Sequence, residues 1–393
     1  MTTGPDIWLE KELAQLREAD QERLLRVLPE AGGKITLDEG PLLNFASNDY
    51  LDLARHPEVI EGAIEAIRQY GTGSTASRLV AGSLPIHQQL EEALADYKNH
   101  PAALLFGSGY MTNAGLITCL VGAQDHVYAD RLIHASILDA VKLSGAHLHR
   151  FRHNDPQHLR EMLKREPKES RRLVVTESVF SMDGDIAPLA EILRAARDHN
   201  AISMVDEAHS TGVFGPEGRG LAHELGVAAD VDISMGTLSK ALGGYGGFAA
   251  CSKTLRNWLI NRSRPFIYTT APPPSVAGAA LAALRVIREN GAMGTTLLDR
   301  AARFRATLRE AGLDTLSSGS QIIPVVVGES AAALALSARL RQQGLLAPAI
   351  RPPTVPRGSA RLRLSVTLAH MDEDLQNAAG HIIECARAEG VLR

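Results

Sequence analysis

Cysteine is scarce in this chain, and the few cysteines that it has form no recognisable framework. Three occur among 393 residues, at Cys119, Cys251 and Cys385. Their number is odd and their spacing is wide, a pattern typical of neither a disulfide scaffold nor a zinc site. We therefore expect a protein of a reducing compartment, without a metal site.

Long apolar runs and an excess of positive charge are also missing. No stretch of about eighteen apolar residues, the length that a membrane-spanning helix needs, runs without a charged residue. Residues 6–27 alternate charged and apolar side chains and lack the basic start and apolar stretch of a signal peptide. The 41 Lys and Arg residues are balanced by 45 Asp and Glu residues, without the basic block that follows a phosphate backbone. These absences predict a soluble cytoplasmic protein that binds neither membrane nor nucleic acid.

The length and the sequence pattern predict two domains after an N-terminal arm. A chain of 393 residues exceeds the size at which one hydrophobic core usually stops growing. Over residues 58–251, segments with helical periodicity alternate with short β-rich runs, which is typical of an α/β fold with a mostly parallel sheet covered by helices. We expect a helical arm at residues 1–45, a large domain at 46–289 and a small α+β C-terminal domain at 290–393.

Two motifs at the ends of predicted strands suggest a site for pyridoxal phosphate (PLP). Asp206 follows an apolar run at 202–205, and Lys240 ends a strand-and-turn segment that a glycine-rich tail at 243–247 follows. Ligands of open α/β sheets bind at the carboxyl ends of the strands. There a lysine amine can form a Schiff base with PLP, while an aspartate keeps the pyridine nitrogen protonated. Taken alone, each residue has a structural alternative: a solvated loop lysine, or an aspartate paired with an arginine.

A glycine-containing turn at residues 106–110 is a candidate for the phosphate-binding loop. The turn reads FGSGY, follows a predicted strand and begins an apolar helix, whose free N–H groups and positive end favour an anion. It lacks the third glycine of a dinucleotide-binding fingerprint, because threonine stands at that position. We expect Gly109 in the cofactor loop, Tyr110 stacked on the ring, and Thr237 and Thr270 as hydroxyl donors to the phosphate.

Three further polar residues fall at the same predicted edge of the sheet. His134 and Ser181 follow predicted strands, and His209 lies three positions after Asp206. His134 could stack on the pyridine ring and act as an acid toward a carbonyl oxygen, and Ser181 could hydrogen-bond the 3-oxygen of the cofactor. A core histidine, a capping serine and a loop histidine are the structural alternatives.

The chain resembles the α-oxoamine synthases, PLP-dependent acyltransferases with the aspartate-aminotransferase fold, also called fold type I. The resemblance runs from about residue 42 to the C-terminus. It is carried by NFASNDYL at 44–51, ADRLIHAS at 129–136, TESVFSMDGD at 176–185, VDEAHSTG at 205–212 and IRPPTVP at 350–356.

The resemblance implies a role for each candidate residue. Lys240 is the implied Schiff-base lysine, and Asp206 and His134 are its catalytic partners. The implied cofactor contacts are Gly109, Tyr110, His134, Ser181, Asp206, His209, Thr237, Lys240 and Thr270. The implied substrate contacts are Arg23, Asn48, His134, Thr354 and Arg363, with Arg26 as an alternative to Arg23. Thr270 would reach in from the neighbouring subunit, which implies a homodimer with shared active sites.

Within the family, the resemblance favours the biotin-synthesis branch. It implies decarboxylative condensation of L-alanine with a pimeloyl thioester, of coenzyme A or of an acyl carrier protein, to 8-amino-7-oxononanoate, CO2 and free thiol. The segment at 350–356 and the run RLRL at 361–364 favour this branch. Glycine C-acetyltransferase, 5-aminolevulinate synthase and serine palmitoyltransferase are alternatives within the family, and an aminotransferase is a more remote one. The identity of the thioester carrier stays open.

Overall fold

The chain folds into two compact units. The computed structural model describes residues 4–25, 27–37, 40–165 and 169–392. We call residues Asn48–Asp299 the core unit, and Met1–Ser47 together with Arg300–Arg393 the terminal unit. The N-terminal segment therefore shares a compact unit with the C-terminal segment. Each unit is described separately.

The core unit contains one large sheet. Its strands are β3 (Ala102–Phe106), β4 (His126–Asp130), β5 (His147–Phe151), β6 (Arg172–Glu177), β7 (Ile202–Asp206), β8 (Ile233–Thr237) and β9 (Gly247–Cys251). They lie in the order β3-β9-β8-β7-β6-β4-β5, and β9 alone runs antiparallel to its neighbours. The predicted mostly parallel sheet is thus confirmed.

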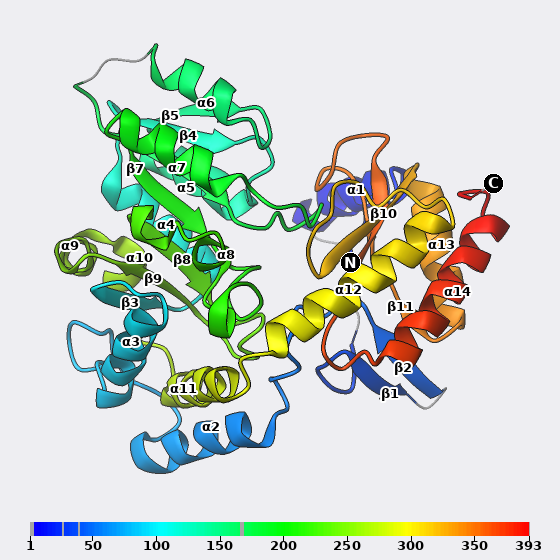
Figure 1. Ribbon diagram of the computed structural model, residues 1–393, viewed down its shortest axis with the longest axis horizontal. Coiled ribbons are helices and arrows are strands. Elements are labelled where there is room, and N and C mark those ends of the chain that lie inside the picture. Colours follow the sequence, from blue (N-terminus) through cyan, green and yellow to red (C-terminus); the bar gives the residue numbers. More distant parts are fainter. Residues whose placement is uncertain (1–3, 26, 38–39, 166–168, 393) are drawn as a thin grey trace. The chain divides into compact units, whose positions relative to one another are not determined.

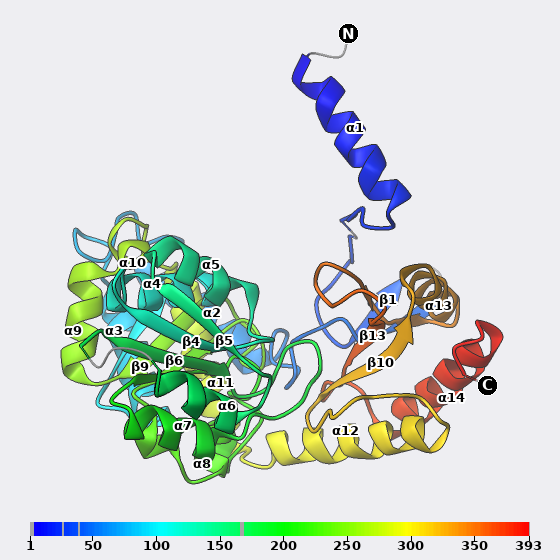
Figure 2. The same cartoon turned by 90° about the horizontal axis from the view of Figure 1, so that it is seen from above.

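The central strands are buried along their whole length because helices cover both faces of the sheet. Every residue of β4, β6, β8 and β9 is buried, whereas most of the edge strand β5 is not. Strands covered on both faces are expected to read as near-continuous apolar runs, as these do. Figure 1 and Figure 2 show the helices around this sheet, with α4 and α5 on one side and α6 and α7 on the other.

The helices of the core unit follow local start signals in the sequence. Pro85 and Pro156 stand in the first turns of their helices, and the Asp155 carboxylate accepts a hydrogen bond from the N–H of His158 at 2.8 Å. In the described ranges, no helix combines the length and apolarity that a bilayer crossing requires. The helices that begin in this unit are α2 (Pro57–Tyr70), α3 (Pro85–Tyr97), α4 (Gly109–Leu120), α5 (Ala135–Ser144), α6 (Pro156–Leu163), α7 (Leu189–Asp198), α8 (Leu221–Glu224), α9 (Lys253–Arg262), α10 (Arg264–Ile267), α11 (Pro274–Glu289) and α12 (Met293–Glu310).

Helices α2 and α11 approach each other so closely that only glycine fits at their contact. A Cβ added to Gly278 would lie 2.2 Å from the backbone oxygen of Gly62, and one added to Gly62 would lie 2.8 Å from the backbone oxygen of Gly278. Both distances are below any normal contact, so the two backbones touch directly. The packing of these helices therefore depends on the two glycines.

The described part of the terminal unit contains two small sheets and three further helices. Its strands are β1 (Lys34–Leu37), β2 (Gly40–Asn44), β10 (Ile322–Gly328), β11 (Leu345–Leu346), β12 (Ala349–Ile350) and β13 (Ala360–Ser365), and its helices are α1 (Gly4–Glu18), α13 (Ser330–Gln342) and α14 (Asp372–Ala388). Strand β2 pairs with β11 in parallel, which joins the N-terminal segment to the C-terminal one. Helix α13 packs against β10, β12, β13 and α14.

Candidate active site

The carboxyl ends of the core strands surround a cavity of about 260 Å³. The turns after β3, β4, β7 and β8 and the last residue of β6 contribute to its wall, as the topology of an open α/β sheet predicts. Its lining residues are Ser108, Gly109, Tyr110, Asn113, His134, Ser136, Glu177, Asp206, Ala208, His209, Met235, Thr237, Ser239 and Lys240.

A chain of hydrogen bonds positions the amine of Lys240. The Lys240 Nζ atom lies 3.0 Å from Nε2 of His209, and Nδ1 of the same imidazole lies 2.6 Å from the hydroxyl of Tyr50. The Tyr50 hydroxyl donates to Oδ1 of Asn48 at 3.1 Å, so its oxygen is available to accept from His209 Nδ1. This arrangement leaves Nε2 of His209 as the acceptor that faces the lysine amine.

The carboxylate of Asp206 is buried and held from two sides. Its Oδ1 accepts a hydrogen bond from the backbone N–H of Ala208 at 2.9 Å, and its Oδ2 accepts one from the Asn113 side chain at 3.1 Å. Asp206 is the last residue of β7, so the strand itself directs it to the cavity. A buried carboxylate favours a cationic partner, and a protonated pyridine nitrogen would be one.

His134 is held as a neutral imidazole with a defined tautomer. Its Nδ1 accepts a hydrogen bond from the backbone N–H of Ser136 at 3.2 Å and lies 2.7 Å from the Ser136 hydroxyl. Since Nδ1 is an acceptor, the ring proton sits on Nε2. Burial lowers the pKa of His134, and the charge of Lys240 lowers it further, whereas Asp206 raises it. The net downward shift keeps the ring neutral at pH 7, with Nε2–H as a donor.

The N-terminus of α4 supplies an anion-binding corner. Ser108 caps the helix by accepting from the N–H of Met111 at 3.1 Å. A Cβ on Gly247 would lie 2.9 Å from the backbone nitrogen of Gly109, so the chain closes tightly around this turn. Nearby, the hydroxyls of Thr237 and Ser239 lie 2.7 Å apart. Helix N–H groups and hydroxyl donors together are the donor set that a phosphate ester needs.

Glu177 is the buried carboxyl group of the cavity that sequence reasoning did not single out. It ends β6 directly beside Asp206 in the sheet register. Burial raises its pKa well above the usual range, and the neighbouring Asp206 raises it further. Glu177 accepts hydrogen bonds from the backbone N–H groups of His134 and Ser181, while its Oε1 is buried without a hydrogen-bond partner among the described residues. Glu177 therefore faces the cavity as a carboxyl group that favours its neutral form.

The structure brings most of the predicted cofactor residues together. Tyr110 lines the cavity with its side chain 52% exposed, and its hydroxyl donates to Asp139 at 3.0 Å. Ser181 is buried beside the cavity, where its N–H bonds to Glu177. Thr270 is exposed and does not line this cavity. The predicted residues in the cavity wall are Gly109, Tyr110, His134, Asp206, His209, Thr237 and Lys240.

Three of the predicted substrate residues belong to the terminal unit. Arg363 is a buried residue of β13, and its guanidinium donates to the Ser365 hydroxyl at 2.8 Å. Arg23 and Thr354 line one hollow of about 650 Å³, although they are 331 residues apart in the chain. Arg26 lies outside the described residues. The other two belong to the core unit: Asn48 accepts a hydrogen bond from Tyr50, and His134 lines the cavity.

Sequence reasoning missed Asn113, Glu177 and Tyr50. Asn113 stands one helical turn after Gly109, and its only sequence signal is that spacing, which places the two on the same face of α4. Glu177 and Tyr50 lie within the segments TESVFSMDGD and NFASNDYL, but neither has a charge partner nearby in sequence. Their roles follow only from the fold, which places them beside Asp206 and His209.

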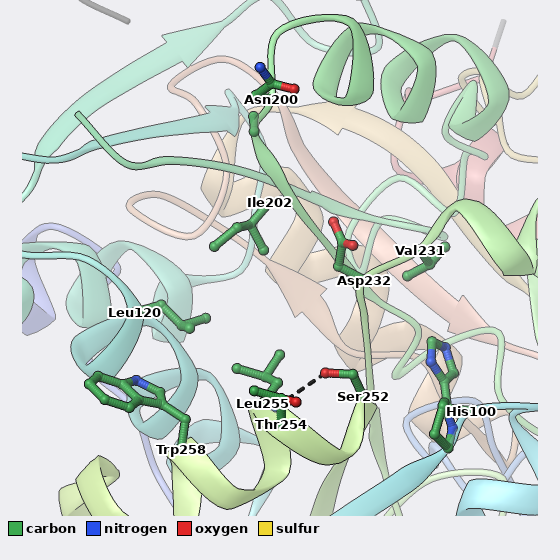
Figure 3. Close-up of a pocket in the computed structure, with 12 residues that line it drawn as sticks. His100, Leu120, Asn200, Ile202, Val231, Asp232, Ser252, Thr254, Leu255 and Trp258 are labelled. Carbon is green, nitrogen blue, oxygen red and sulfur yellow. Dashed lines mark hydrogen bonds between the residues drawn. The ribbon is translucent and has the colours of Figure 1, made fainter. Parts of the chain in front are cut away.

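Another hollow, of about 740 Å³, lies at the opposite edge of the sheet in the core unit (Figure 3). Ile202 at the start of β7 and Trp258 of α9 are among its lining residues. It contains none of the predicted cofactor residues. The chemistry-bearing groups are therefore gathered in the smaller cavity, at the carboxyl edge.

Comparison with known proteins identifies the family. A family model described as aminotransferase class I and II matches residues 40–382. The chain belongs to this family. The assignment confirms the predicted fold type I and the expectation of a PLP-dependent enzyme. The residues of the cavity fit PLP: the Lys240 amine, the buried Asp206 carboxylate and the anion-binding corner at α4 all face one space of about 260 Å³.

Individual relatives are similar over nearly the whole chain. A protein of Geobacter sulfurreducens named 8-amino-7-oxononanoate synthase is 46% identical over 97% of this chain and 98% of its own length. A variant of serine palmitoyltransferase from S. paucimobilis with a bound PLP–myriocin aldimine has a TM-score of 0.92 and 32% identity, with 98% of both chains covered. A crystal structure of 8-amino-7-oxononanoate synthase from Francisella tularensis has a TM-score of 0.77 and 28% identity, covering 89% of this chain and 99% of the other.

Proposed function

We propose that the protein catalyses the decarboxylative condensation of L-alanine with a pimeloyl thioester to 8-amino-7-oxononanoate, CO2 and free thiol. The observation that carries the proposal is the cavity itself, in which Lys240, Asp206, His134 and His209 meet at one edge of the sheet. The name of the Geobacter sulfurreducens relative, at 46% identity over nearly its full length, supports this choice within the family.

The residues around the Lys240 amine account for the first half of the reaction. PLP, when bound, supplies an electron sink that stabilises negative charge at the Cα atom of an amino acid. Lys240 would hold the cofactor and then take the Cα proton of alanine, with His209 Nε2 as the acceptor that orients its amine. Asp206 would keep the pyridine nitrogen protonated, because its carboxylate is fixed by Asn113 and Ala208. Ser181 would hold the 3-oxygen of the ring.

His134 would act on the acyl donor. Its neutral ring carries the proton on Nε2, which can donate a hydrogen bond to the thioester carbonyl oxygen as negative charge develops there. A neutral N–H donor polarises the carbonyl without transferring its proton prematurely to the nearby lysine amine. Arg363 would bind the alanine carboxylate through its guanidinium, a geometry that favours carboxylates.

The hollow in the terminal unit is our candidate for the acyl-substrate site. Arg23 and Thr354, which the family resemblance assigns to the acyl substrate, both line it. Arg351 also lines this hollow and donates to the backbone oxygen of Asp20, which ties the 350–356 segment to the N-terminal segment. With Arg17, three guanidinium groups line this hollow, and they suit an acyl donor that carries a carboxylate or phosphate. Both coenzyme A and a carrier protein present such groups.

We propose that the protein is a homodimer of the cytoplasm. Thr270 is exposed and lies away from the cavity of its own chain, as expected for a residue that reaches the site of a neighbouring subunit. Its neighbour Tyr268 leaves 72% of its side chain exposed, and the Arg264 guanidinium covers the ring at 4.8 Å. An exposed aromatic ring beside Thr270 fits an interface between copies of the chain.

Serine palmitoyltransferase activity is the second candidate. Solved structures of that enzyme have TM-scores of 0.92 and 0.93 with this chain, at 32% and 34% identity. We prefer the first candidate because the curated relative with that name is more similar in sequence, at 46% identity. The cofactor machinery of both activities is the same, so the cavity in the core unit does not distinguish them.

A turnover assay distinguishes the candidates. The purified holoenzyme is incubated with alanine, glycine or serine, each with pimeloyl-CoA, pimeloyl carrier protein, acetyl-CoA or palmitoyl-CoA, and the products are measured by mass spectrometry. We expect 8-amino-7-oxononanoate from alanine and a pimeloyl thioester. Preferred turnover of serine with palmitoyl-CoA, or of glycine with acetyl-CoA, would overturn the proposal. Transfer of the amino group to a keto acid would indicate an aminotransferase.

A further inference from the structure

Two loops beyond the ends of β4 and β6 carry His134 and Ser181. The first loop follows Asp130, the last residue of β4, and the second follows Glu177, the last residue of β6. The pairing of β4 with β5 ends at Asp130 and that of β6 with β7 ends at Glu177, so the sheet itself does not fix the positions of the loops. Other contacts must set how the two side chains stand in the cavity.

His153, in the turn after β5, bridges these two loops. Its Nδ1 lies 2.8 Å from Oδ1 of Asp130, and its Nε2 lies 2.7 Å from Oδ2 of Asp185. The side chains of Asp130 and Asp185 are 0% and 5% exposed, and that of His153 is 25% exposed. The ring meets Phe180 edge-on, with centroids 4.5 Å apart. Carboxylate oxygens only accept, so both ring nitrogens donate and the ring is an imidazolium.

Asn154 donates hydrogen bonds to the same two aspartates as its neighbour His153. Its backbone N–H donates to Oδ2 of Asp130 and its side chain donates to Oδ2 of Asp185, both at 2.8 Å. Asn154 has φ 51°, in the left-handed region that asparagine tolerates better than most residues. The tight turn thus presents two consecutive residues to the same pair of carboxylates.

Each of the two aspartates also makes a hydrogen bond within the loop that carries a proposed cofactor residue. Asp130 Oδ1 also accepts from the N–H of Leu132 at 2.8 Å, two residues before His134. The backbone oxygen of Asp185 accepts from the N–H of Phe180 at 3.1 Å, which closes the turn around Ser181. The loops are therefore linked twice: inside the cavity through Glu177, and behind it through His153.

We infer that His153 is a positioning residue of the active site, whose imidazolium clamps Asp130 to Asp185 and thereby sets the separation of His134 and Ser181 around PLP. The inference rests on the proposed cofactor roles of those two residues. His153 does not touch the cavity and takes no part in the chemistry. Its effect on cofactor affinity and on turnover comes through the loops that it joins.

The charge of the clamp is retained across the neutral pH range. Burial lowers the pKa of His153, but the hydrogen bonds and charges of Asp130 and Asp185 raise it, and the net result is a pKa of about 10. Two buried carboxylates that would otherwise repel each other share one cation. A neutral side chain at this position would leave that repulsion between the two loops.

The test compares His153→Gln with His149→Gln. His149 lies on the same strand-and-turn segment, and its ring pairs with His126 at 2.8 Å instead of with a loop carboxylate. We expect His153→Gln to weaken PLP binding to the apoprotein by about 10- to 100-fold and to lower kcat by a similar factor, with the KM for alanine within about threefold. We expect His149→Gln to change each quantity by less than about threefold.

Two results would overturn the inference. One is PLP affinity and kcat of His153→Gln within about threefold of the wild type; the other is an equal loss in His149→Gln, which would indicate a general loss of structure. If His153→Gln does not fold, the Asp185→Asn variant is measured instead. In that variant His153 keeps its hydrogen bond to Asp130 and only the charge of residue 185 is removed. That variant must also lose PLP affinity, or the inference fails.

The same experiment separates this inference from the proposed function. PLP binding to the apoprotein reports on the clamp without any substrate. Wild-type protein that binds PLP but does not turn over alanine with a pimeloyl thioester would overturn the proposed reaction alone. Loss of PLP affinity in His153→Gln would still support the clamp in that case.

Discussion

The amine of Lys240 lies 3.0 Å from Nε2 of His209, whose other ring nitrogen lies 2.6 Å from the hydroxyl of Tyr50. Tyr50 and His209, which are far from Lys240 in the sequence, therefore position the Lys240 amine. Tyr50 enters from the segment before α2, His209 follows β7, and Lys240 follows β8. The lysine side chain is consequently directed at the cavity.

Asp206→Asn tests the electron-sink role of the carboxylate. The amide has nearly the same shape and can still accept from the N–H of Ala208, but it has no charge to keep the pyridine nitrogen protonated. We expect kcat/KM to fall by about 10²- to 10³-fold while the thermal midpoint changes little. Steady-state kinetics and circular dichroism measure the two effects. The exposed Asp198→Asn is the matched control, and equal activity of both variants would contradict the assignment.

Glu207 follows Asp206 in the VDEAH segment, but its role is structural, because it forms a buried ion pair with Lys98. Lys98 Nζ lies 2.6 Å from Glu207 Oε2, and the two side chains are 0% and 1% exposed. Lys98→Met would leave the carboxylate buried and unpaired, at a cost of about 3–5 kcal/mol in the free energy of unfolding. The double variant Lys98→Met/Glu207→Gln should lose less. Urea unfolding measures both, and a double variant less stable than the single one would refute this explanation.

The contact of α2 with α11 predicts opposite effects for two Gly→Ala substitutions. In Gly278→Ala the new methyl group would meet the backbone oxygen of Gly62, so we expect destabilisation by about 1–3 kcal/mol. Gly380, an exposed position in α14, has no atom within 4 Å of an added Cβ. There we expect stabilisation by about 0.5–1 kcal/mol, since alanine favours a helix. Thermal unfolding of the two variants should shift in opposite directions; a shift in the same direction would contradict the predicted contact.

His370 predicts how the stability of the terminal unit depends on pH. Its ring donates to the backbone oxygen of Gly33 at 2.9 Å, and burial lowers its pKa to about 4. A depressed pKa means that the folded state favours the neutral ring, so this stabilisation is complete above pH 6.5 and is lost as the pH falls toward 4. We expect a loss on the order of 3 kcal/mol over that interval. Denaturant titrations from pH 7 to pH 4 measure it, and His370→Gln should flatten the dependence; an unchanged slope in that variant would assign the effect to other groups.

The large sheet was predictable because its strands carry their own signal. The apolar run at 202–205 corresponds to β7, and the strand expected before the turn at 106–110 is β3. The direction of β9 was not predictable, since an apolar run of five residues suits a parallel or an antiparallel neighbour equally well. The pairing of β2 with β11 could not be predicted from the sequence either, because the two strands are separated by most of the chain.

The candidate site was predictable where residues end strands and unpredictable where they act through packing. Asp206 and the turn at Gly109 follow apolar strands, so the topology alone places them at the carboxyl edge. Asn113 and Glu177 gain their roles from contacts with Asp206 across helix and sheet. His153 is more distant still, since its two carboxylate partners lie 23 and 32 residues away.

The attachment point of the cofactor is the most direct test of the account. The holoprotein is reduced with borohydride, digested, and searched by mass spectrometry for a pyridoxyl group on each lysine. We predict the group on Lys240, and none on any lysine of the Lys240→Ala variant. A pyridoxyl group on another lysine of the wild-type protein, or PLP bound without any such bond, would contradict the central claim.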